Sequence, residues 1–184
     1  MYRSLGQIKH IVTAGALLIS TAAVAETGKL DALYDQLQDA TEDTYLSIEE
    51  QIYTEWGRSG SASMDLLVKR GREAIEVGDT EAALDHFSAL VDHAPDFAEG
   101  YAGRAQAYFE LGLFGPALDD LRQTLVLEPR HFGAMAGLAI MFEAMEEPAR
   151  ALEAYEAAAA VHPLEPSIAG AIERLERRLD GQTI

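Results

Sequence analysis

The sequence predicts an all-α, right-handed α-solenoid of helix–turn–helix repeats, with a degenerate N-terminal hairpin and a C-terminal capping helix. A proline returns every 34 residues, at Pro95, Pro129 and Pro163. Small residues and large apolar residues return in phase with it. A period of this length is typical of a helix–turn–helix unit, and such units stack because one unit alone cannot bury its apolar face.

Five columns of residues share this period. Small residues are expected where the two helices of a repeat cross closely, so a leucine at Ala117 would overpack the contact by about 1–3 kcal/mol. The columns are Leu67, Tyr101 and Met135; Gly71, Ala105 and Ala139; Ala74, Tyr108 and Phe142; Ala83, Ala117 and Ala151; and Phe87, Leu121 and Tyr155.

Residues 1–25 have the design of a secretory signal peptide. A basic start with Arg3 and Lys9 precedes an apolar segment over 11–20, and an A-x-A cleavage sequence ends at Ala25. The apolar segment is too short to span a bilayer comfortably. We therefore expect cleavage after Ala25, export of the product and no stable membrane insertion afterwards.

Residues 26–60 are expected to form a degenerate helical hairpin. Apolar residues recur at helical spacing over 28–39, and a second apolar stripe ends at Trp56, directly before the helix-stopping Gly57. Shifting the repeat by 34 residues puts Glu49 where alanine is expected. We interpret the hairpin as an atypical fourth repeat that caps the N-terminal end. A buried Trp56 would belong to the core, whereas an exposed Trp56 would mark an interface.

Three clear repeats fill residues 61–165. Proline suits the first turn of a helix, so Pro116 and Pro148 are expected to begin the second helices of repeats two and three. Pro166 is expected to begin a last helix. The predicted repeats are 64–97, 98–131 and 132–165, and the predicted C-terminal cap is 166–184, with Arg174, Arg177 and Arg178 on its outer face.

The repeat pattern resembles the tetratricopeptide repeat (TPR) family over about residues 64–165. Each unit has an alanine, a large residue four positions later and a closing proline, as in Ala83, Phe87 and Pro95. The chain departs from the family at its tryptophan column, and at Glu146, which replaces the turn glycine. With its short signal sequence, the chain resembles periplasmic TPR proteins of Gram-negative bacteria, alphaproteobacteria in particular. The resemblance implies a concave groove that binds proteins, lined by the first helix of each repeat.

The groove residues expected from the repeat phase are first-helix side chains outside the packing columns. Lys69 and Arg72 could hold a carboxylate of a ligand, or could pair with acidic residues on their own helix. Phe109 is the expected aromatic anchor. Glycines and alanines in the wall either admit a peptide closely or tighten the helix packing. The candidate partner-binding residues are Asp65, Lys69, Arg72, Glu99, Gly103, Gln106, Phe109, Glu110, Gly137, Ile140 and Glu143.

Charge and composition narrow the partner class. With 14 basic and 31 acidic residues, the net charge is −17. Such a chain is a poor candidate for binding nucleic acid or anionic membranes, and favours basic partners or simply solubility. Cysteine is absent from the sequence, so disulfides do not hold the fold.

Catalytic and ligand-binding motifs find no support. Ser59 does not lie in a Gly-x-Ser-x-Gly elbow, and there is no glycine-rich phosphate loop. The histidines His86, His93, His131 and His162 form no metal-ligand motif, and we expect His93 and His162 to serve the turns. We predict no enzyme activity, no cofactor and no metal.

Two functions therefore remain in competition. The first is a non-enzymatic periplasmic adaptor that binds a protein or peptide segment in its groove. The second is a structural subunit of a homo-oligomer or envelope complex, joined through its caps or convex face. The sequence leaves the oligomeric state open.

Overall fold

The computed structural model describes residues 21–181, and every regular element in this range is a helix. Two helices precede the repeats, three pairs of helices form the repeats, and a single helix follows them. The helices are α1 (Thr21–Gln38), α2 (Tyr45–Trp56), α3 (Ala62–Glu76), α4 (Thr80–His93), α5 (Ala98–Glu110), α6 (Phe114–Leu127), α7 (Phe132–Ala144), α8 (Pro148–Val161) and α9 (Pro166–Asp180).

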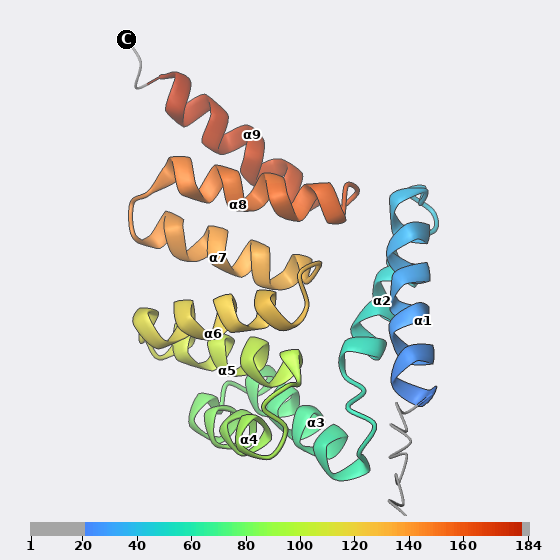
Figure 1. The fold of residues 1–184 in the computed structure, drawn as a ribbon. Coiled ribbons are helices and arrows are strands. Elements are labelled where there is room, and N and C mark those ends of the chain that lie inside the picture. The colour runs from blue at the N-terminus through green and yellow to red at the C-terminus, as the bar shows by residue number, and fades with distance from the viewer. Residues whose placement is uncertain (1–20, 182–184) are drawn as a thin grey trace, which may run out of the picture.

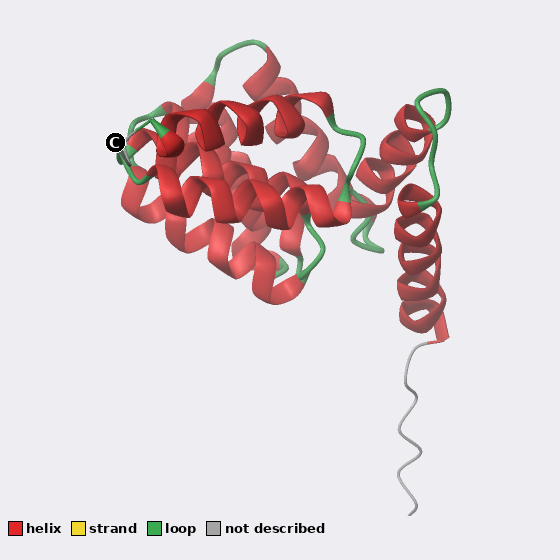
Figure 2. Cartoon of the chain, turned by 90° about the horizontal axis from the view of Figure 1, so that it is seen from above, coloured by secondary structure: helices red, strands yellow, loops and turns green. Residues whose placement is uncertain are grey.

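Helices α3 to α9 stack in chain order, each packing on the next, so the predicted α-solenoid is confirmed (Figure 1). Seen from above, the stack is a layered body with the N-terminal hairpin standing beside it (Figure 2). The alanine column at the helix crossings, Ala83, Ala117 and Ala151, is completely buried. The small size of these side chains lets the paired helices approach closely.

The turn inside each repeat has one geometry, repeated three times. A residue with positive φ follows the first helix: Gly78 at 75°, Gly112 at 72° and Glu146 at 59°. The next residue donates its backbone N–H to a carbonyl five residues back, as Asp79 does to Ala74 at 2.8 Å. This is the Schellman closure of a helix. Glu146 adopts the same turn without the freedom of glycine.

The ring of Phe87 explains why residues 71 and 103 are glycine. A Cβ atom on Gly71 would lie 2.6 Å from this ring, and one on Gly103 would lie 2.2 Å from it. The ring therefore fills the space left by both residues, one on α3 and the other on α5. Phe87 joins the first repeat to the second.

Two boundaries differ from expectation. Helix α6 begins at Phe114, two residues before Pro116, because the first N–H groups of a helix need no intrahelical partner and a proline there loses no bond. Helix α1 begins at Thr21 and so includes the predicted cleavage position after Ala25. Residues 1–20 of the predicted signal peptide lie outside the described residues. Within 21–181, no helix is long and apolar enough to cross a membrane.

The N-terminal hairpin is helical as expected, but its interpretation as a stacked capping repeat is wrong. Neither α1 nor α2 packs broadly on α3, and α1 instead reaches α8 at the far end of the stack (Figure 1). The hairpin lies across the inter-repeat turns. Its side chains explain this position, since Gln38 Nε2 donates to the carbonyls of Ala160 at 3.0 Å and Val161 at 2.7 Å, and Asp31 pairs with Arg130.

An apolar cluster fastens the hairpin to the turn before α7. Trp56 is only 6% exposed and therefore belongs to this core. Phe132, the first residue of α7, supplies the solenoid side of the cluster. The buried members are Leu33, Tyr34, Leu37, Ile52, Trp56 and Phe132.

Candidate protein-binding groove

A groove with a volume of about 640 Å³ runs along the first helices of the repeats. Helices α3, α5 and α7 form its walls, as the repeat phase predicts, and Tyr53 of α2 reaches one part of it. Of the eleven candidate residues, eight line it: Arg72, Glu99, Gly103, Gln106, Phe109, Glu110, Gly137 and Ile140. A binding role for them stays a prediction.

The structure places the other three candidates outside this groove. Asp65 accepts hydrogen bonds from the backbone N–H of Ser59 at 2.8 Å and its hydroxyl at 2.6 Å, which ties the joint after α2 to α3. Lys69 pairs with Glu73 one helical turn away at 3.6 Å, the local alternative that the sequence left open.

Glu143 faces the last helix instead. Its carboxylate accepts from Arg174 at 2.8 and 2.9 Å and from the hydroxyl of Tyr155 at 3.1 Å. Arg174 was expected only to cover the outer face of the cap. The ion pair therefore gives Glu143 a structural role, which is to tie α7 to α9.

The glycines of the groove wall make room for neighbouring side chains of the solenoid core. Gly103 is buried beneath Phe87, and a Cβ atom on Gly137 would lie 3.2 Å from Leu121. The packing alternative therefore accounts for both glycines. The partly exposed Ala102 and Ala136 still leave the groove surface smooth.

The apolar part of the groove lies between α5 and α7. Phe109 is half-buried, with its ring 5.7 Å from that of Phe114, so part of the expected aromatic anchor is open to the groove. Ile140 is 45% exposed and lines the same groove. These two side chains are the apolar contacts that an incoming segment can cover.

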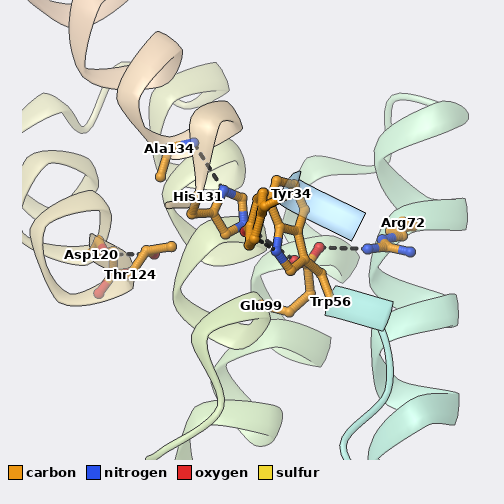
Figure 3. Close-up of polar contacts among 8 residues, drawn as sticks. All are labelled: Tyr34, Trp56, Arg72, Glu99, Asp120, Thr124, His131 and Ala134. Atoms are coloured by element: carbon orange, nitrogen blue, oxygen red, sulfur yellow. Dashed lines mark hydrogen bonds and ion pairs between the residues drawn. The ribbon is translucent and has the colours of Figure 1, made fainter. Parts of the chain in front are cut away.

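A buried polar cluster closes the groove near the hairpin (Figure 3). Arg72 Nη2 donates to Glu99 Oε1 at 2.7 Å, which links α3 to α5. The second oxygen of Glu99 lies 3.5 Å from Nε2 of His131, an ion-pair distance without good hydrogen-bond geometry. The other ring nitrogen of His131 accepts from the backbone N–H of Ala134 at 3.0 Å and caps α7.

Trp56 completes this cluster from the hairpin side. Its ring stacks on that of His131, with centroids 3.8 Å apart and planes 12° apart, and its indole N–H donates to the hydroxyl of Tyr34 at 3.0 Å. No sequence pattern predicts that His131 meets Trp56, because no repeat column relates the elements on which they lie. The aromatic residues of the second hairpin helix were the available sign that this helix packs against another part of the fold.

Opposing influences act on the pKa of Glu99. Burial alone would raise this pKa, but the nearby His131 and Arg72 and the hydrogen bond from Arg72 outweigh it, so the pKa lies below its ordinary value. Glu99 is therefore charged at neutral pH and uses Arg72 as its counterion. The proposed pairing of Arg72 with acidic residues of its own helix is wrong, and its cation is no longer free for a ligand.

The remaining charge of the groove is acidic. Glu76 is exposed on the wall, with no cationic partner among the described residues. Glu110 accepts from two neutral donors, Thr80 Oγ1 at 2.9 Å and Gln106 Nε2 at 3.3 Å, and no cationic partner for it occurs in the described part of the chain. The groove thus combines an apolar strip with two available carboxylates.

Comparison with known proteins agrees with this geometry. No protein-family model matches the chain. A TPR repeat-containing protein of Rhizobium etli is 32% identical over 154 residues, which are 83% of this chain and 76% of that protein. The Sgt2 TPR domain from Aspergillus fumigatus has a TM-score of 0.62 at 22% identity, over 67% of this chain and 83% of that one. The TPR2B domain of yeast Sti1, solved in a complex with pHsp70, has a TM-score of 0.59 at 25% identity, over 64% and 99%.

The stacked helix pairs and their concave groove define the class as an α-solenoid of helical repeats. The identity to the Rhizobium protein, over most of both chains, shows the family. The chain belongs to the tetratricopeptide repeat family.

Proposed function

We propose that this protein is a non-enzymatic adaptor of the periplasm that binds a segment of a partner protein in its groove. The observation that carries the proposal is the apolar strip of Phe109 and Ile140 beside the available carboxylates of Glu76 and Glu110. A segment with an apolar anchor and a neighbouring lysine or arginine complements this surface.

The character of this partner segment is opposite to the acidic one that Lys69 and Arg72 suggest in the sequence. Arg72 is already paired with Glu99, and Lys69 lies outside the groove. The net charge of −17 also favours encounter with basic partners. The complex of the Sti1 TPR2B domain with pHsp70 supports the general mode, in which a TPR surface holds part of another protein.

The periplasmic location is proposed from the design of residues 1–25. Fractionation of the native host, with mass determination of the mature N-terminus, tests it. A periplasmic product that begins at Glu26 supports the proposal, and a cytoplasmic product that keeps Met1 contradicts it.

Crosslinking in the native host, followed by purification and mass spectrometry, tests the adaptor function. Enrichment of one envelope protein supports an adaptor. Recovery of the bait crosslinked only to itself contradicts it and favours a homo-oligomeric structural role. The buried position of Trp56 removes the observation that would have favoured that second role.

A charge-matched pair of variants then locates the binding surface. The change Glu76→Gln/Glu110→Gln removes two groove carboxylates, and we expect it to weaken binding of the recovered segment by about tenfold or more, as loss of charge-assisted contacts does. The control Glu153→Gln/Glu156→Gln removes two exposed carboxylates from α8, outside the groove. Equal effects of the two double variants would exclude the groove as the binding surface.

A further inference from the structure

Three possible metal ligands meet where the hairpin crosses the end of the solenoid. Glu49 comes from α2, His162 is the residue that ends α8, and Glu165 is the residue that precedes α9. One ligand atom from each lies within 4.8 Å of the other two. Helices α3 to α8 separate Glu49 from the other two in the sequence, so no ligand motif could reveal the cluster.

His162 is the observation that makes this cluster more than a group of acidic residues. Its side chain is 0% exposed, and neither ring nitrogen has a hydrogen-bond partner within the described residues. Leaving buried polar atoms without partners costs free energy, so such atoms need an explanation. Its Nε2 faces the carboxylate of Glu49, with Nε2 and Oε1 3.8 Å apart.

Aromatic packing holds the imidazole in this orientation. The ring of His162 makes edge contacts with those of Tyr45 and Phe132, at centroid distances of 5.7 and 4.9 Å. The ring is thus fixed in place before any ligand arrives.

Within residues 21–181, neither Glu49 nor Glu165 forms an ion pair with a lysine or arginine. One oxygen of Glu165, Oε1, accepts from the N–H and the hydroxyl of Ser167 at 3.1 and 2.6 Å, which caps α9. Its second oxygen remains for a ligand. Both carboxylates are partly exposed, so an ion can enter from solvent.

We propose that Glu49, His162 and Glu165 form a site for a divalent transition metal ion, with zinc as the best fit. One imidazole nitrogen and two carboxylate oxygens are ordinary zinc ligands, and a water molecule would complete the tetrahedron. Bonds of about 2.0–2.2 Å place the ligand atoms of a tetrahedral zinc ion roughly 3.4 Å apart, so small rotations of the two glutamates suffice.

The ion would act as a clip between two parts of the fold. Glu49 belongs to the hairpin, and the other two ligands belong to the corner between α8 and α9. Binding therefore fastens the hairpin to the far end of the solenoid. An ion that binds only the folded state also raises its stability by mass action.

Zinc titration of the chelator-treated protein tests the site. We expect one Zn²⁺ per chain by calorimetry, a rise in Tm on binding, and visible absorption of tetrahedral intensity when Co²⁺ replaces zinc. Glu49→Gln and His162→Gln are each expected to weaken binding by more than about tenfold, since even partners of metal ligands contribute that much. His93→Gln is the control, because it removes an exposed histidine at the end of α4 that is not one of the three ligands. We expect this variant to bind zinc with the affinity of the parent protein.

Two outcomes overturn the proposal. One is the absence of stoichiometric binding in the parent protein, and the other is binding that survives both Glu49→Gln and His162→Gln. Because His162 is buried and its replacement could disturb folding, helix content and Trp56 emission are checked first. Glu49 is the partly exposed ligand, so Glu49→Gln keeps the test decisive if His162→Gln unfolds.

Discussion

At the scale of single residues, the buried Glu99 holds the helices of the groove wall together. Its carboxylate on α5 contacts Arg72 of α3 and His131, the residue that caps α7, so one side chain links three helices of the groove wall. It was predicted to face a partner. The structure uses it to hold the groove together instead, because a buried carboxylate needs counter-charges and hydrogen bonds.

We predict that Glu99→Gln lowers the free energy of unfolding by about 1–3 kcal/mol at pH 7, since Arg72 loses a charged acceptor and the buried His131 loses a neighbouring charge. The pKa of Glu99 lies below its ordinary value of 4.5. Its stabilising charge is therefore present above that pH and is lost as pH falls toward the lowered pKa. Urea denaturation of both proteins between pH 7 and pH 3.5 measures the difference.

The gap between parent and variant is expected to narrow below about pH 4.5 as the carboxyl group is protonated. Glu73→Gln, on an exposed site of α3, serves as the control and is expected to change stability by less than about 0.5 kcal/mol. A gap that is constant across the whole pH range would contradict the assignment of the effect to ionised Glu99.

At the scale of elements, the same turn geometry joins the two helices of each repeat. The three turns differ in one respect, because the third has Glu146 at a positive φ of 59° where the first two have glycine. A non-glycine residue in this conformation costs about 1–2 kcal/mol. The helix pair of the third repeat therefore forms despite a strained closing residue.

We predict that Glu146→Gly raises the free energy of unfolding by about 0.5–1 kcal/mol, because the relief of strain exceeds the entropy cost of glycine. The reverse change at the equivalent position, Gly112→Ala, is expected to lower it by about 1 kcal/mol. Thermal and chemical denaturation measure both. Stabilisation by Gly112→Ala would show that the turn geometry is not the source of the effect.

At the scale of the whole molecule, the solenoid was predictable because its signal is repeated. Each repeat presents the same columns, so Ala83, Ala117 and Ala151 report one contact three times. The groove wall followed from the same phase, and Phe109 and Ile140 lie where it places them. Repetition makes such contacts readable without knowledge of the rest of the fold.

The docking of the hairpin was not predictable in this way. Its contacts with the solenoid occur once, as in the stacking of Trp56 on His131, and no period relates the two residues. The pairing of Arg72 with Glu99 was not predicted for the same reason, since the spacing of charges along α3 suggested acidic partners on that helix. The helices themselves could be predicted from short-range sequence patterns, whereas these contacts depend on how separate elements meet in space.

The hairpin can be followed by the single tryptophan of the chain, Trp56, which lies at its junction with the solenoid. We predict that Leu37→Ala, on a fully buried side chain of α1, costs about 2–5 kcal/mol and loosens the hairpin. Its tryptophan emission is then expected to shift to longer wavelength while the far-UV signal of the solenoid helices persists.

Leu175→Ala is the matched control in a different apolar cluster. Leu175 is 1% exposed on α9 and packs in a cluster that does not include Trp56, so its removal creates a comparable cavity away from the hairpin core. We expect lower stability with unchanged emission under native conditions. If both variants shift the emission equally, the hairpin and the solenoid unfold as one unit.

The docked hairpin also places the first-made part of the described chain against the last. Stacked repeats contact mainly their sequence neighbours, so each can form soon after it is synthesised. Gln38, in contrast, bonds to a carbonyl 123 residues later, and Asp31 pairs with a residue 99 positions away. The hairpin side of the apolar cluster therefore lacks its buried solenoid partner until Phe132, the first residue of α7, has been made. During that interval a growing chain presents an uncovered apolar segment, which is the kind of surface that a holding chaperone binds.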